Sequence, residues 1–140
     1  MSVSPEFVDT NILLYAVDHS EPEKQARAAA LLSRLWEARS GCLSVQVLQE
    51  FYVNATRKLS KPLDVPTARQ AVEDYSLWVV HAPTSASVLA AIDLQAAHQL
   101  SFWDAMVLNS ALELGASTLW SEDLNAGQYY GDTVVRSPFV

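Results

Sequence analysis

The chain has 140 residues, half of them hydrophobic, with nine Lys and Arg against sixteen Asp and Glu and a formal net charge of −7. This composition predicts one globular domain over residues 1–140 and excludes a chain that is mainly disordered. No uncharged apolar run is long enough to span a membrane, and the acidic balance argues against tight, sequence-independent binding to nucleic acid through a basic face.

Short apolar runs with strand character alternate with longer segments whose apolar residues recur at the helical period. Ser20 to Glu23 has the pattern of a capping box that opens the second helix, and Gly41 is expected to end that helix. Residues 128–131 are expected to form a turn. In chain order, strands are predicted at residues 6–9, 42–44, 77–80, 117–120 and 133–136, and helices at residues 11–17, 21–39, 45–59, 66–75, 85–99 and 102–114.

Parallel strand pairing follows from this alternation, because strands separated by helices of ten or more residues are joined by right-handed crossovers. The expected fold class is therefore α/β, a three-layer sandwich with a short, mainly parallel central sheet. In open sheets of this kind, binding and catalytic sites form outside the carboxyl ends of the strands. We therefore expect functional side chains at that edge.

Four acidic residues that are far apart in the sequence fall at or near this edge. Asp9 ends the first predicted strand, and Asp123 follows the fourth. Asp104 lies in the first turn of the last predicted helix, and Glu50 lies one to two turns into the helix after the second strand. We expect the four carboxylates to converge.

Each acid has a simpler interpretation when it is taken alone. Asp9 is placed to cap the first helix, and Asp104 lies in a segment that matches a capping box. Asp123 suits an ordinary turn and Glu50 suits a solvated helix face. Caps and solvated acids are commoner than ligands, but they do not explain why four acids meet at the edge where sites form. Together, the four favour a site.

Several ionised carboxylates in one place need a counter-charge. Two carboxylates about 5 Å apart repel each other by roughly 3 kcal/mol at an effective dielectric constant near 20. Oxygen ligands without neighbouring His or Cys select Mg²⁺ or Mn²⁺ over Zn²⁺, and such ions act on oxygen-rich substrates such as phosphates. The pattern predicts metal-assisted hydrolysis of phosphodiester bonds.

Four blocks of the sequence, which extend over nearly the whole chain, are familiar in their order and spacing. They are FVDTN at residues 7–11, SVQVLQEFY at 44–52, SFWDAM at 101–106 and WSEDLN at 120–125. Together they resemble a PIN-domain ribonuclease, and most of all the VapC-like toxins of bacterial toxin–antitoxin pairs.

The resemblance implies roles for individual residues. The acidic quartet that holds Mg²⁺ or Mn²⁺ and carries out catalysis would be Asp9, Glu50, Asp104 and Asp123. Polar side chains that support the acids or a metal-bound water would be Thr10, Asn11, Ser121 and Glu122. Separately, the densest basic group consists of Arg57, Lys58 and Lys61, and it is a candidate for contacts with substrate phosphates. The simpler interpretation is a helix end, where the helix dipole also favours cations.

The resemblance also implies partners. It implies an RNA substrate, with tRNA and ribosomal RNA as candidates, a homodimer, and a cognate antitoxin that covers the site and often inserts a basic side chain among the acids. Since Cys42 is the one cysteine and no leader pattern is present, we expect a cytoplasmic protein.

Two other functions remain open at this point. A phosphatase similar to the haloacid dehalogenases also carries an aspartate after its first strand, but its D-x-D motif needs an acid where Asn11 stands. A binding module without catalysis would use the acids only to hold the arginines of a partner. Metal-dependent cleavage of RNA separates these functions from a nuclease.

Overall fold

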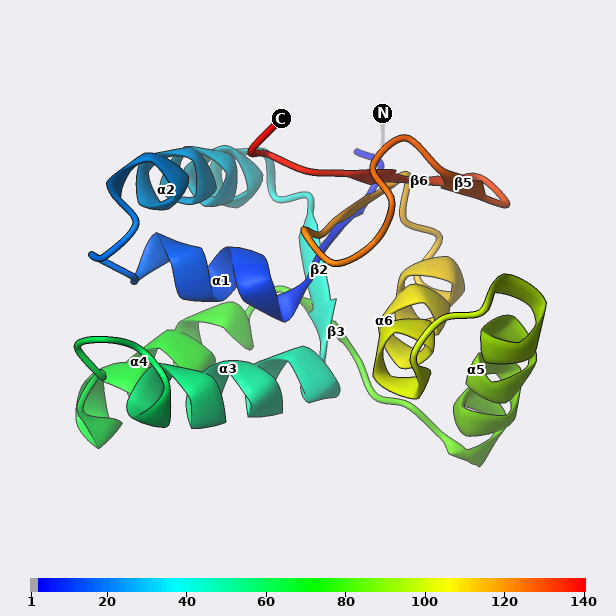
Figure 1. Cartoon of the computed structure of the whole chain (residues 1–140), viewed down its shortest axis with the longest axis horizontal. Coiled ribbons are helices and arrows are strands. Elements are labelled where there is room, and N and C mark those ends of the chain that lie inside the picture. Colours follow the sequence, from blue (N-terminus) through cyan, green and yellow to red (C-terminus); the bar gives the residue numbers. More distant parts are fainter. Residues whose placement is uncertain (1–2) are drawn as a thin grey trace.

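A six-stranded sheet with helices on both faces forms the centre of the protein (Figure 1). The structure is a computed structural model, and it describes residues 3–140. The strands are β1 (Glu6–Val8), β2 (Gly41–Ser44), β3 (Val79–His81), β4 (Thr118–Trp120), β5 (Tyr129–Tyr130) and β6 (Thr133–Arg136). The helices are α1 (Thr10–Ala16), α2 (Pro22–Ala38), α3 (Val45–Arg57), α4 (Val65–Tyr75), α5 (Ser85–His98) and α6 (Phe102–Glu113).

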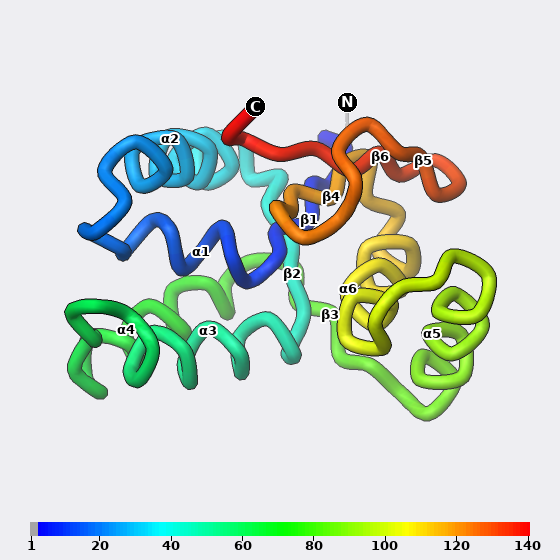
Figure 2. Tube along the Cα trace, viewed as in Figure 1, coloured from blue at the N-terminus to red at the C-terminus, as the bar shows by residue number. Residues whose placement is uncertain are grey.

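The strand order is β3-β2-β1-β4-β6-β5, and every pairing is parallel except that of β5 with β6. Helices α1 to α4 lie on one side of the sheet, and α5 and α6 lie on the other (Figures 1 and 2). This arrangement confirms the expected three-layer α/β sandwich. After β1, the chain adds β2 and β3 on one side of β1, and it then crosses over to add β4 on the other side. A crevice forms at such a switch point, beyond the carboxyl ends of the strands.

Three local predictions were wrong. Ser20 does not cap α2, because its hydroxyl donates to the Asp18 carboxylate 2.6 Å away, and Glu21 holds the cap position without a side-chain hydrogen bond. Helix α2 ends at Ala38 and is capped by Arg39, which adopts the left-handed conformation with φ of 55°, while Gly41 already belongs to β2. Residues 128–131 include β5, which pairs with β6 and extends the sheet.

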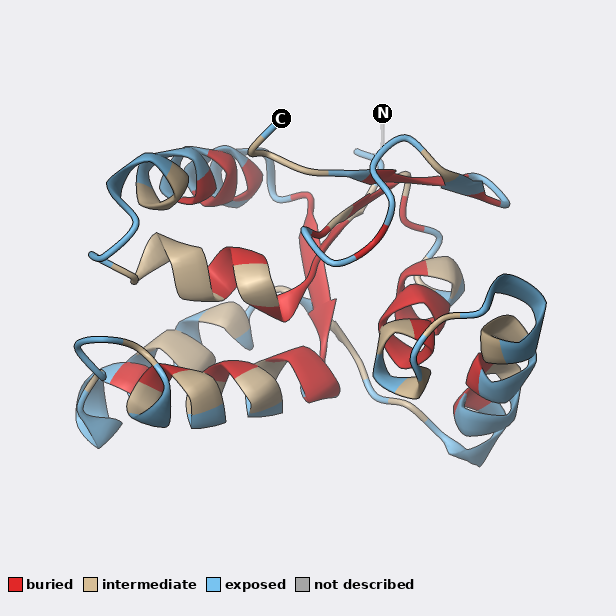
Figure 3. Ribbon diagram, in the orientation of Figure 1, coloured by how far each residue is buried: buried red, intermediate tan, exposed pale blue. Residues whose placement is uncertain are grey.

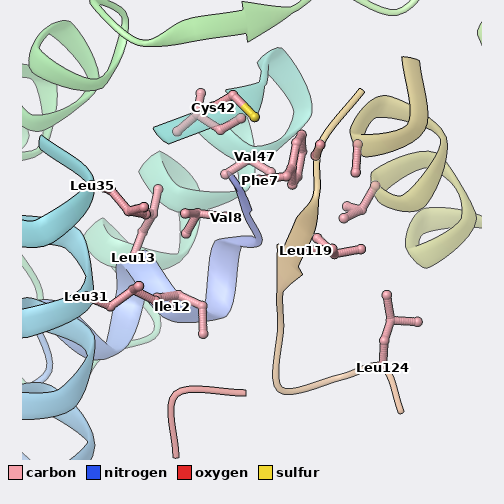
Figure 4. Packing of buried hydrophobic residues seen from close by; sticks show 14 of the residues in the cluster. Phe7, Val8, Ile12, Leu13, Leu31, Leu35, Cys42, Val47, Leu119 and Leu124 are labelled. Carbon is pink, nitrogen blue, oxygen red and sulfur yellow. The ribbon is translucent and has the colours of Figure 1, made fainter. Parts of the chain in front are cut away.

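Strands β1 and β4 are anchored by a continuous apolar core (Figures 3 and 4). Phe7 and Leu119, which pair across these strands, are both fully buried. Ile12 and Leu13 continue the core along α1, and Leu124 anchors the segment that follows β4. The core therefore fixes the carboxyl ends of β1 and β4. Among residues 3–140, no helix has the length and apolar character needed to cross a membrane.

Gly41 is needed where β2 passes beneath an aromatic cluster. A Cβ atom at this position would lie 2.6 Å from the Trp78 ring, which is inside van der Waals contact. The Trp78 ring is packed against two other aromatic rings, with its centroid 5.1 Å from those of both Trp36 and Tyr75. Only glycine fits here without displacing the ring.

We expect Gly41→Ala to lower the free energy of unfolding by about 1–3 kcal/mol, the usual cost of overpacking a filled core. The loss should shrink in a Trp78→Leu background, where the opposing ring is absent. Urea denaturation of the four proteins in this double-mutant cycle measures both effects. An equal loss in the two backgrounds would contradict the steric explanation.

Candidate active site

Asp9 lies at the centre of the carboxyl edge and is 4% exposed. Its backbone N–H donates to the Trp120 carbonyl oxygen at 2.9 Å, which continues the pairing of β1 with β4 by one residue. Its carboxylate accepts the Thr10 N–H at 2.7 Å and the Ser121 hydroxyl at 2.8 Å. Asp9 therefore caps α1, as its simpler interpretation predicts, and its second carboxylate oxygen is bonded to Ser121 at the carboxyl edge of the sheet.

Asn11 and Ser121 connect Asp9 to Asp123. The Asn11 amide donates to Asp123 at 3.0 Å and to Asp9 at 3.4 Å, and its oxygen accepts the Glu122 N–H at 3.3 Å. The Ser121 hydroxyl oxygen accepts the Asp123 N–H at 3.1 Å. These bonds hold the loop after β4 against the start of α1. The single Asn11 amide donates to both carboxylates, Asp9 and Asp123.

Glu50 is held from two directions. The Thr10 hydroxyl donates to one carboxylate oxygen at 3.1 Å, and the Gln46 amide donates to the other at 2.8 Å. The same Gln46 nitrogen reaches the Trp103 carbonyl oxygen at 3.3 Å, which ties α3 to the first turn of α6. Gln46 was not among the site residues predicted from the sequence. Its spacing of four residues from Glu50 was the available signal.

Asp104 completes the group from the first turn of α6, where the Ser101 hydroxyl caps its N–H at 3.1 Å. Burial raises the pKa of Asp104, the Ser101 bond opposes the rise, and the charges of Asp123 and Glu50 add to it. The structure therefore brings the four predicted acids together closely enough for their charges to interact. They come from four separate places: the end of β1, α3, α6 and the loop after β4.

Asp9 carries the largest electrostatic cost within this group. Burial raises its pKa to about 7, the bonds from Ser121 and Thr10 oppose the rise, and the charges of Asp123 and Glu50 add to it. Even with these donors in place, the ionised form is much less favoured than that of a carboxyl group in water, whose pKa is 3.8. The arrangement favours a bound positive charge.

The donor chemistry fits a hard divalent cation. Carboxylate, hydroxyl and amide oxygens surround the crevice, and these are the ligands that Mg²⁺ and Mn²⁺ prefer. The buried Gln46 Oε1 has no hydrogen-bond partner within residues 3–140, so one more oxygen of this region is left without a donor. Among the same residues, no three His, Cys, Asp or Glu side chains form a ready-made metal cage. The carboxylates would therefore have to move closer together to share one ion.

Glu122 points away from the quartet despite its position beside Asp123. Its carboxylate forms an ion pair with Lys24 and accepts the Tyr15 hydroxyl at 2.7 Å. Burial opposes ionisation of Glu122, but the bonds from Lys24 and Tyr15 outweigh it and lower its pKa. In this structure Glu122 fixes the loop that carries Asp123 and makes no direct contact with the other acids.

Among the three basic candidates, the structure brings Lys58 nearest to the acids. Lys58 and Asp123 both line a cavity of about 400 Å³ between α1 and α3. Arg57 and Lys61 are exposed and do not line that cavity.

We expect Asp9→Asn to stabilise the metal-free protein at high pH. A folded-state pKa near 7, against the usual 3.8, means that stability from this group is greatest below the unfolded-state pKa and falls as pH rises toward 7. Removing the charge should add about 2–4 kcal/mol to the free energy of unfolding at pH 8 and little at pH 4.

Urea denaturation in EDTA at the two pH values measures this difference. Asp93→Asn is the matched control, because Asp93 is an exposed acid on α5. A variant at Asp9 that is no more stable than the parent at pH 8 would show that the charge at this position is already neutralised.

Comparison with solved structures supports the fold. A chain from a toxin–antitoxin complex of Klebsiella pneumoniae superimposes with a TM-score of 0.68 and 17% identity, over 95% of this chain and 97% of that one. VapBC2 of Rickettsia felis, bound to a DNA fragment from its promoter, gives 0.65 and 15% identity over 94% and 97%. VapC20 of Mycobacterium tuberculosis, a toxin that cleaves the sarcin–ricin loop, gives 0.59 and 20% identity over 81% and 85%.

Sequence comparison assigns the family. No curated protein sequence matches the chain. The family model of the PIN domain matches residues 7–131, which include all four acids and the polar side chains that bind them. The match extends from β1 to the turn between β5 and β6, so it contains the carboxyl ends of β1, β2, β3 and β4. The chain belongs to the PIN domain family.

Proposed function

We propose that the protein is a metal-dependent endoribonuclease that hydrolyses RNA phosphodiester bonds. The observation that carries this proposal is the convergence of Asp9, Glu50, Asp104 and Asp123, where burial and mutual repulsion raise the pKa of Asp9 to about 7. Such a cluster is costly without a cation and well suited to one. Its oxygen-only chemistry supports Mg²⁺ or Mn²⁺.

The four carboxylates would close on the ion to hold it, and the polar side chains around them set the orientation from which they start. A bound Mg²⁺ or Mn²⁺ would supply an activated water and would stabilise the negative charge of the leaving oxygen. Thr10 and Gln46 fix both oxygens of Glu50, and Ser121 fixes one oxygen of Asp9. With these donors, the ligands need less reorganisation when the substrate arrives.

A toxin role with a cognate antitoxin is the second part of the proposal. The structural neighbours include a toxin–antitoxin complex, a VapBC2 complex and a VapC20 toxin. A basic antitoxin segment would be attracted to a crevice that gathers four acids in a chain of net charge −7. Ribosomal RNA or tRNA is the proposed substrate, and the reducing cytoplasm suits a protein whose only cysteine is a buried free thiol.

We expect the purified protein to cut tRNA or ribosomal RNA at discrete positions with Mg²⁺ or Mn²⁺ and to be inactive in EDTA. Asp9→Asn and Asp104→Asn should each lower the cleavage rate by more than about 100-fold. Thr10→Val, which removes one donor to Glu50, should lower it by about 10–100-fold. Gel analysis of end-labelled RNA measures the rates.

Asp93→Asn serves again as the control and should cleave at the rate of the parent. Cutting that persists in EDTA would exclude a metal-dependent site. Turnover of a small phosphomonoester would favour the phosphatase, whereas metal binding without cleavage of any RNA would favour a partner-binding module.

We also propose a homodimer formed through α5. Val88, Leu89 and Ile92 form an exposed apolar surface on this helix, and Leu89 is 64% exposed. Helix α5 packs against α6 through its other side, so this surface is turned away from the core (Figure 3). Burial of such a surface by a second copy would remove it from water.

We expect Leu89→Glu combined with Ile92→Glu to convert a dimer into a monomer, because two charges would be buried at the interface. Light scattering after size-exclusion chromatography measures the mass. Leu77→Glu is the control, since Leu77 is 81% exposed and lies outside α5. A dimer that survives the double substitution would place the interface elsewhere.

A further inference from the structure

A cavity of about 400 Å³ lies between α1 and α3, directly beside the four acids. Its lining residues are Asn11, Leu14, Tyr15, Asp18, Asn54, Lys58, Leu59, Glu122 and Asp123. Asn11 and Asp123 belong both to this cavity and to the candidate active site. A substrate held at the acids would therefore extend into the cavity without a gap. The volume is within the range of pockets that bind small ligands.

The α3 wall of the cavity changes in chemistry with distance from the acids. Glu50, Asn54 and Lys58 are spaced four residues apart, so they share one face of the helix. An acid, an amide and an amine thus follow one another along about 12 Å of helix. Asn54 is half-buried and lines the cavity, so its side-chain amide brings a donor and an acceptor to a ligand bound there.

Tyr15 provides a rigid aromatic wall on the α1 side. Its hydroxyl donates to Glu122 at 2.7 Å and accepts from Lys24 at 3.3 Å. Its ring meets the Phe139 ring edge-on, with centroids 5.0 Å apart. The Lys24 Nζ atom lies over one face of the ring, 4.7 Å from its centroid, so a flat ligand would pack against the other face. A ring held by these contacts loses little entropy when such a ligand binds. Aromatic rings of this kind are common platforms for unpaired RNA bases.

The charges of the cavity favour a neutral ligand over a phosphate. Glu122 is paired with Lys24, Asp123 accepts from Asn11, and Asp18 accepts from Ser20, so each lining carboxylate already has a donor. Lys58 is the one basic side chain of the lining. A phosphate deep in this cavity would meet three carboxylates. A nucleobase is uncharged, and an exocyclic amino group would find carboxylate and amide acceptors there.

We propose that this α1–α3 cavity binds one unpaired nucleobase of the RNA, in the nucleotide next to the cut phosphate, and favours a base with an exocyclic amino group over uracil. The proposal rests on the nuclease function proposed above. Asn54 reads the edge of the base, Tyr15 supports its face, and Lys58 at the outer end meets the following phosphate. The cavity thereby contributes to the choice of the cut position.

Nuclear magnetic resonance titration tests the binding without any cleavage. AMP, CMP, UMP and ribose 5-phosphate are each added to the full chain with Mg²⁺. The shifts of the Asn54 side-chain amide are followed, together with those of the backbone amide of Leu59, a lining residue whose signal remains in Asn54→Leu. We expect AMP and CMP to shift these signals more strongly than UMP, with ribose 5-phosphate without effect. Asn54→Leu should weaken the binding of AMP by about 3- to 10-fold, the cost of one hydrogen bond.

Gln49→Leu is the matched control, because Gln49 is exposed on α3 and does not line the cavity. Equal shifts from ribose 5-phosphate and AMP would overturn the proposal, because they would show phosphate binding alone. The proposal would also be overturned if N-acetylarginine amide shifted these signals and no nucleotide did. That result would assign the cavity to a basic side chain of a protein partner.

Sequencing of cleavage ends gives an independent measurement. We expect Asn54→Leu to change the preferred base at one position beside the cut, while cleavage still needs Asp9, and Gln49→Leu to leave the preference unchanged. Cleavage with an unaltered base preference and no nucleotide-induced shifts would overturn the cavity proposal and leave the nuclease function standing. Base-dependent shifts in a protein that cuts no RNA would support the cavity while removing the proposed function.

Discussion

The parallel pairing of β1 with β4 is the contact on which the candidate active site depends. Val8 is opposite Trp120, so the residues that follow the two strands, Asp9 and Ser121, lie side by side. The Ser121 hydroxyl donates to the Asp9 carboxylate at 2.8 Å. A slip of one residue would turn every side chain of the strand to the other face. Fully buried Phe7 and Leu119 prevent that slip, because each would lose its place in the core. Apolar packing thus sets the position of the two polar residues.

The acids brought together in this way work against the stability of the fold. Asp9 already receives hydrogen bonds from Thr10 and Ser121, yet burial and the neighbouring charges still raise its pKa to about 7. Neutral donors are therefore insufficient, and only a positive charge or a proton relieves the remaining cost. A structural role for the acids would not require this cost, since a single cap at Asp9 would serve α1 equally well. More carboxylates meet here than helix capping requires, and this excess favours a catalytic role over a purely structural one.

The sequence indicated the acids and three of the side chains that bond to them, Thr10, Asn11 and Ser121, but it did not indicate Gln46 or Lys24. Asp9 and Asp123 could be located because the end of a strand is a local property, visible in a few residues. The pairing of Lys24 with Glu122 spans 98 positions, and the bond from Gln46 to Trp103 spans 57, so neither has a local signature. Ser20 shows the converse: its capping pattern was present, but Asp18 took its hydroxyl. Local patterns predicted the helices and strands. They failed at Ser20, where the Asp18 carboxylate and the backbone of α2 compete for one hydroxyl group.

Glu122 and Asp123 illustrate how the chain uses its few cations. These neighbours point in different directions, and Lys24 binds Glu122, so the loop is fixed while Asp123 remains with Asn11. Lys24 is thus engaged in positioning the loop. With a net charge of −7, the whole-protein field repels RNA, and affinity must arise locally. A metal ion held by the acids would supply strong positive charge at this edge, and Lys58 would add a weaker charge at the cavity. Binding and cleavage of RNA would therefore depend on the same ion, so loss of the metal would remove affinity together with catalysis.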